Sequence, residues 1–124
     1  MTPALLGKKV GITRIYDDKG SIVPVTVVAA GPCTVTQVKT ADGKDKYNAV
    51  QLGFGDTKRK HSNFALIGHA AKAGSAPKRH FHEIKLKNPT DKQLGDTVTV
   101  ELFNEVQFVD VIGTSKGKGF AGVM

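Results

Sequence analysis

The chain has 124 residues, 40% of them hydrophobic, and its 18 Lys and Arg exceed its 11 Asp and Glu, giving a formal net charge of +7. This length suffices for one core and one domain. No apolar run approaches the ~20 residues that a membrane helix needs, and we expect no signal peptide in MTPALLGKKV. The single cysteine, Cys33, excludes an internal disulfide and a multi-cysteine zinc site, and we expect it to be a small buried side chain.

The first half of the chain has the periodicity of β-strands. We expect strands over residues 9–16, 22–30, 33–40 and 47–54, separated by turns rich in Asp and Gly. The second of these is β-branched almost throughout, which is typical of a strand covered on both faces. Pro24 lacks an N–H, which indicates that this strand begins at a sheet edge or is unpaired at that point. Val35 and Val38 have opposite parity, which indicates a β-bulge in the third strand.

The second half contains one helical segment among further strands. Residues 62–73 favour a short helix, capped by Ser62 or Asn63. A strand is expected over residues 79–86, the cleanest alternation lies in residues 97–102, and a last strand is expected over residues 106–112. Short strands with one helical insertion indicate a mainly β fold, a small β-barrel.

The positive charge is concentrated in one quarter of the chain. Residues 57–87 hold eight bases and one acid, so this window has a balance of +7, whereas the remainder has ten bases and ten acids. All four histidines lie in the same window. Clustered positive charges repel one another unless an anionic partner neutralises them, so the charge pattern favours nucleic acid as the partner. An acidic membrane surface is the weaker alternative, because Ala, Gly and Ser dominate the window instead of large apolar residues.

Clusters of Lys and Arg suit phosphate contacts, because neighbouring side chains can bind successive phosphates whatever the nucleotide sequence is. For any one cluster the alternative is a solvated charge run. The aromatic residues are too few for a single-strand stacking platform, so structured RNA is the better target. The expected RNA-binding residues of the window are Lys58, Arg59, Lys60, His61, Lys72, Lys78, Arg79, His80, Lys85 and Lys87.

An enzyme is the competing class of function. His80 and His82 are two residues apart in a predicted strand and could share a face. A metal site would need a third ligand, and the histidines have no recognised ligand spacing and no accompanying nucleophile or acid pair. GKKVGIT lacks the spaced glycines of a P-loop. We therefore expect no catalytic residue, no metal and no cofactor.

Residues 113–122, GTSKGKGFAG, combine glycines with Lys116 and Lys118. Successive glycines let backbone N–H groups approach an oxyanion, although such segments also serve as flexible linkers.

Several segments together resemble a known family. LLGKKVGITRIYDDKG, VVAAGPCTVTQVKT, YNAVQLGFG, GHAAKAG, LGDTVTVELF and VDVIGTSKGKGFAGVM occur in the order seen in bacterial large-subunit ribosomal protein three, the universal "L three" family. The resemblance runs from Leu5 to Met124, and GTSKGKGF-x-GVM is its most specific part. Ile12, Ile112, Ala65 and Ala70 depart from the usual residues, without disturbing the glycines or the bases.

The resemblance implies a six-stranded barrel of the translation-protein type, complete or incomplete, with a basic insertion at residues 57–87. It implies a cytoplasmic, early-assembling constituent of the large ribosomal subunit that binds 23S rRNA beside ribosomal proteins fourteen and nineteen. Residues 113–124 would begin an extension toward the peptidyl-transferase centre. Lys116, Lys118 and Phe120 would enter the RNA there, joined by Lys8, Lys9 and Arg14 from the first strand. Family members continue further, so the resemblance also implies a truncated chain with an unpaired strand edge. A free-standing barrel module, binding RNA or protein, is the alternative.

Overall fold

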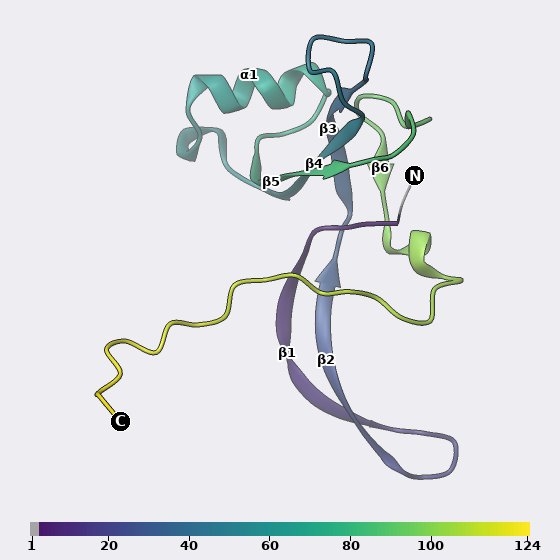
Figure 1. Cartoon of the computed structure of the whole chain (residues 1–124), viewed down its shortest axis with the longest axis vertical. Helices are drawn as coiled ribbons and strands as arrows, with labels where there is room; N and C mark the ends of the chain where they lie inside the picture. The colour runs from purple at the N-terminus through teal and green to yellow at the C-terminus, as the bar shows by residue number, and fades with distance from the viewer. Residues whose placement is uncertain (1–2) are drawn as a thin grey trace.

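The computed structural model describes residues 3–124 as a mainly β protein with two sheets and one α-helix (Figure 1). The first sheet is the hairpin β1–β2, and the second has the strand order β5-β4-β3-β6. A closed barrel is not found within residues 3–124, so of the two expected forms the incomplete one agrees with the structure. The elements are β1 Gly7–Tyr16, β2 Ile22–Ala30, β3 Cys33–Lys39, β4 Ala49–Asp56, α1 Phe64–Lys72, β5 Lys78–Lys85 and β6 Thr97–Val98.

The hairpin β1–β2 extends away from the four-stranded sheet (Figure 1). Its antiparallel register runs from Gly7 opposite Ala30 to Tyr16 opposite Ile22. The turn forms as its sequence predicts, because the Asp17 carboxylate accepts hydrogen bonds from the backbone N–H groups of Lys19 and Ser21, at 3.0 and 2.8 Å. β2 is an edge strand, as expected from its proline.

The core lies between the four-stranded sheet and the chain that enters β1. It is built on five buried residues, Cys33, Val35, Val50, Leu52 and Val98. The predicted bulge in β3 is confirmed, because the register with β4 shifts between Val35 and Gln37. Cys33 is fully buried, and this burial raises the pKa of its thiol, which donates to the Leu6 carbonyl at 3.5 Å.

Helix α1 forms where the sequence predicts and is tied to the sheet by polar contacts. The Asn63 side chain caps it by accepting from the Leu66 N–H at 2.9 Å. His69 Nε2 lies 2.6 Å from Gln51 Oε1 on β4, and the Thr36 hydroxyl on β3 donates to the same oxygen at 2.9 Å. The His69 ring also meets Phe81 of β5 edge to face, with centroids 5.5 Å apart. The side chains of β4 and β5 therefore contact the helix through His69, and Thr36 of β3 orients Gln51 for this contact.

Two expected strands are wrong in part or whole. Only Thr97–Val98 of the expected strand 97–102 pairs with β3, and Val100–Phe103 forms a 3-10 helix instead. The expected strand 106–112 is not formed, and its Phe108, Val111 and Ile112 are largely exposed. Alternation alone does not make a strand without a neighbouring edge to pair with.

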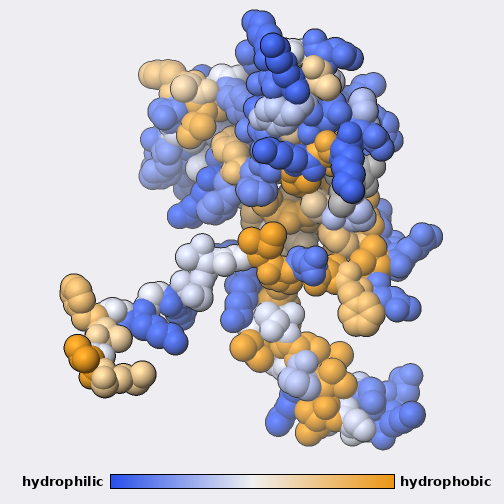
Figure 2. Space-filling view, in the orientation of Figure 1, coloured by the Kyte–Doolittle hydropathy of each residue, from blue (hydrophilic) through white to orange (hydrophobic). Residues whose placement is uncertain are grey.

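The prediction that β2 is covered on both faces is also wrong. Ile22, Val27 and Val28 are 55%, 43% and 47% exposed, and Ile12 on β1 is 72% exposed. Figure 2 shows apolar side chains over the hairpin, at the middle of the molecule and at the C-terminal end, whereas the surface over the four-stranded sheet and the helix is mainly hydrophilic. A two-stranded sheet cannot bury both faces of its β-branched side chains, so these remain exposed.

Replacing the helix cap tests its contribution to stability. Asn63→Ala removes the acceptor for the Leu66 N–H and should lower the free energy of unfolding by about 1 kcal/mol. Urea denaturation followed by circular dichroism measures this change. Ser62→Ala is the neighbouring control; equal losses for the two variants would contradict the assigned cap.

Candidate nucleic-acid interface

Strand β5 carries the centre of the basic surface. It pairs antiparallel with β4, with Lys78 opposite Asp56, His80 opposite Phe54 and His82 opposite Leu52. His80 and His82 lie two residues apart in this strand and are both exposed, as expected for side chains on one face. Arg79 is exposed as well.

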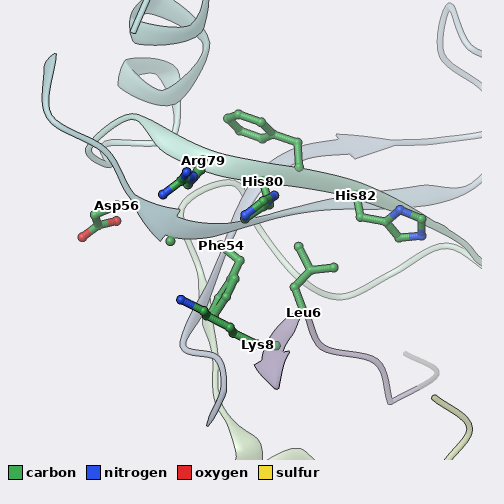
Figure 3. Close-up of a pocket in the computed structure, with 10 residues that line it drawn as sticks. Leu6, Lys8, Phe54, Asp56, Arg79, His80 and His82 are labelled. Carbon is green, nitrogen blue, oxygen red and sulfur yellow. The ribbon is translucent and has the colours of Figure 1, made fainter. Parts of the chain in front are cut away.

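A cleft lies between the start of β1 and the paired ends of β4 and β5, and we call it the β1–β5 cleft (Figure 3). It encloses about 690 Å³. Phe54 and Leu6 give it an apolar side, since both pack against the core. Its other lining residues are Gly7, Lys8, Gly55, Asp56, Arg79, His80, Phe81 and His82.

A second cleft of about 510 Å³ lies toward the helix, and we call it the α1-side cleft. It is lined by Thr57, Lys58, His61, Ser62, Leu66 and Lys78, and it shares Asp56 and Arg79 with the first cleft. The shared residues make the clefts neighbours. Lys78 is paired with Asp56. We call the other cationic and imidazole side chains of the two clefts the basic track: Lys8, Lys58, His61, Arg79, His80 and His82.

Lys78 is held by an ion pair. Its ammonium lies 2.5 Å from the Asp56 carboxylate, and only 10% of its side chain is exposed. Gly53 makes this position possible, because a Cβ at that residue would lie 2.7 Å from the Lys78 side chain. Because Asp56 already balances the charge of Lys78, this lysine is less available to a phosphate than its neighbour Arg79.

A second polar network crosses the sheet beside the track. The Tyr47 hydroxyl donates to Glu83 on β5 at 2.5 Å, and the Lys39 ammonium on β3 lies 2.9 Å from the same carboxylate. Together these contacts hold the pKa of Glu83 below its usual range, the hydrogen bond from Tyr47 being the larger cause. Hydrogen bonds to Tyr47 and Glu83 raise the pKa of Lys39. Lys85 lies over the Tyr47 ring, 5.7 Å from its centroid.

The remaining predicted RNA-binding residues lie apart from the two clefts. Arg14 is on the projecting hairpin opposite Pro24, and Lys72 ends helix α1. Arg59 and Lys60 are exposed in the 3-10 helix that also contains His61. The others, all exposed, are Lys9, Lys87, Lys116, Lys118 and Phe120.

The structure adds residues that the sequence did not single out for binding. Leu6, Phe54 and Thr57 line the clefts, and His82 joins His80 there. The Thr57 hydroxyl is buried without a hydrogen-bond partner in the described part of the chain. No sequence signal joins residues 6–8 to residues 79–82, because their proximity is purely tertiary.

Within residues 3–124, no group of three or more His, Cys, Asp or Glu side chains lies close enough to hold a metal ion. Among the same residues, no helix has the length and apolar character to cross a membrane.

Comparison with known proteins gives close relatives. No family model matches the chain. The large ribosomal subunit protein uL3 of Corynebacterium urealyticum is 55% identical over 97% of this chain, and those of Corynebacterium jeikeium and Corynebacterium efficiens are 50% and 49% identical over the same share. The chain belongs to the uL3 family.

Membership in the uL3 family confirms the resemblance seen in the sequence. The chain spans about half the length of the curated relatives it matches, 55% in each of the three. Those relatives are named as ribosomal proteins and not as enzymes, in agreement with the expectation that this chain is not an enzyme.

The Glu83 contacts give a pH dependence with a defined sign. A carboxyl whose pKa is lowered by folding contributes stability above its unfolded pKa of about 4.3, and this contribution is lost as the pH falls through the folded value. The free energy of unfolding should therefore decrease on acidification below about pH 4.3, and Glu83→Gln should make that decrease shallower. Denaturant melts between pH 2.5 and 7 measure it. Glu101→Gln, at an exposed carboxylate, is the control; an acid limb identical in Glu83→Gln and the parent chain would contradict the assignment.

Proposed function

We propose that this uL3-family chain is a structural constituent of the large ribosomal subunit that binds 23S rRNA directly through the basic track. The observation that carries the proposal is the meeting of Lys8, Arg79 and Lys58, from three separate segments, along two adjoining clefts. The names of the relatives support the ribosomal setting, and the charge of residues 57–87 supports an RNA partner. From the family resemblance we also propose that the chain is cytoplasmic and joins the subunit early in its assembly.

The proposal assigns roles to two segments. Residues 57–87 are the basic insertion, which contributes every member of the track except Lys8. Residues 113–124 begin the extension toward the peptidyl-transferase centre, where Lys116 and Lys118 neutralise phosphates and Phe120 contacts RNA. Their exposure supports this role, because these side chains are available to a partner. Ribosomal proteins fourteen and nineteen are the proposed protein neighbours.

Salt dependence of RNA binding tests the proposal. The logarithm of the association constant for 23S rRNA should fall linearly with the logarithm of salt concentration, by about 0.7 to 0.9 for each phosphate neutralised. Replacing Lys58, Arg59 and Lys60 by alanine should reduce the slope by up to about three units if all three face phosphates. Filter binding between 50 and 300 mM KCl measures both slopes.

A matched control separates local contacts from net charge. Lys19, Lys44 and Lys46 are exposed and lie outside both the track and the basic insertion, so their replacement by alanine removes the same charge and should leave the slope nearly unchanged. Equal slope changes in the two triple variants would contradict the placement of phosphates at residues 58–60. Salt-indifferent binding by the parent chain would overturn the RNA-binding function.

The free-standing module is distinguished by assembly. A ribosomal constituent should sediment with large subunits through a high-salt sucrose cushion when it is supplied during reconstitution, since its RNA contacts become enclosed by the assembled particle. Sedimentation with subunits lost at the first salt wash, with RNA binding intact, would favour the free-standing module.

A further inference from the structure

The β1–β5 cleft is more elaborate than phosphate contacts require. Exposed Lys and Arg side chains on a convex surface can bind phosphate oxygens, and such contacts need no concavity. This cleft instead combines an apolar side, formed by Leu6 and Phe54, with Lys8, Arg79 and His80 around it (Figure 3). A mostly apolar concavity with a few convergent polar groups is the usual form of a small-molecule site.

We propose that the β1–β5 cleft binds one unstacked nucleotide of the RNA, with its base against Phe54 and its phosphates at Lys8 and Arg79. This inference rests on the proposed function and deepens it, because it replaces contact with the RNA backbone alone by a pocket for one base. RNA loops and bulges offer such bases, which proteins stack on aromatic rings and read along their polar edges.

The size and chemistry of the cleft fit that occupant. Its volume of about 690 Å³ lies in the range of ligand pockets, about 300 to 1,000 Å³. His80 and His82 can each donate or accept a hydrogen bond, and so can read the edge of a base. Asp56 adds acceptor oxygens at one end, with its charge balanced by Lys78. A site for phosphate alone would gain nothing from this acceptor.

Strand pairing and one loop hydrogen bond hold the backbone around the apolar side of the cleft, so this side exists before the ligand arrives. Phe54 and His80 face each other across the β4–β5 ladder, and Leu6 is anchored through its carbonyl, which accepts from the Gly31 N–H at 3.0 Å. Gly55, which also lines the cleft, has φ of +75°, a backbone conformation that glycine adopts without steric strain. Preformed sites avoid the cost of ordering side chains on binding.

Two hairpin RNAs that differ only by one bulged adenosine test the proposal. The parent chain should bind the bulged RNA about 5- to 150-fold more tightly than the fully paired one, the range expected for stacking one base. Phe54→Leu keeps an apolar side chain and should reduce this ratio toward one. His80→Ala, on the exposed rim, should also reduce it and does not touch the core. Fluorescence anisotropy at constant salt gives the ratio, and a thermal melt checks that each variant is folded.

Lys60→Ala is the control, because Lys60 lines neither cleft and its loss should weaken binding to both RNAs by the same factor. A parent ratio near one, or a ratio that persists in both cleft variants, overturns the nucleotide pocket while salt-dependent binding leaves the RNA-binding function standing. If neither RNA binds, the RNA-binding function is contradicted, and titration with adenosine 5′-monophosphate tests whether the cleft binds a nucleotide. NMR shifts of the His80 and His82 rings with this nucleotide but not with inorganic phosphate support it, and their absence overturns it.

Discussion

The antiparallel pairing of β4 with β5 is the constraint on which the candidate interface depends. β4 supplies Ala49, Val50 and Leu52, all fully buried, and so fixes the ladder to the core. β5 then inherits its register, which sets His80 against Phe54 and Lys78 against Asp56. Every property of the two clefts follows from this placement, because the same strand faces β1 at one end and the helical insertion at the other.

The acids of the chain are arranged so that some lysines are structural and others remain available. Asp56 holds Lys78, and Glu83 with Tyr47 holds Lys39 across the sheet. These pairs lie beside the track and orient β5 without neutralising Arg79, which borders both clefts. Like charges are thus kept close together on a rigid strand, an arrangement whose repulsion an anionic partner relieves.

Local patterns were sufficient to predict the elements whose partners lie near in sequence. The Asp17 turn, the Asn63 cap and the β3 bulge each depend on a few neighbouring residues, and the structure has all three. The predicted strand over residues 106–112 is wrong because a strand forms only where it pairs with a sheet edge, and local sequence does not show whether one is near. The exposure of β2 has the same origin, since no other element of residues 3–124 covers its β-branched side chains. The sequence did not predict that Phe54 lines a cleft, because only the tertiary structure brings Leu6 and His80 beside it.

The candidate RNA-binding surface therefore has two parts of different mechanical character. The track is built on paired strands, whereas residues 107–124 have neither helix nor strand and extend from the body (Figure 1). Fixing one backbone residue costs roughly 1–2 kcal/mol, so each contact made by the extended part contributes less to equilibrium affinity than an equal contact on the track. In the proposed function its lysines would act instead over distance, enlarging the radius within which a polyanion is captured. The extended part would thus govern how fast the complex forms, and the strands how long it lasts.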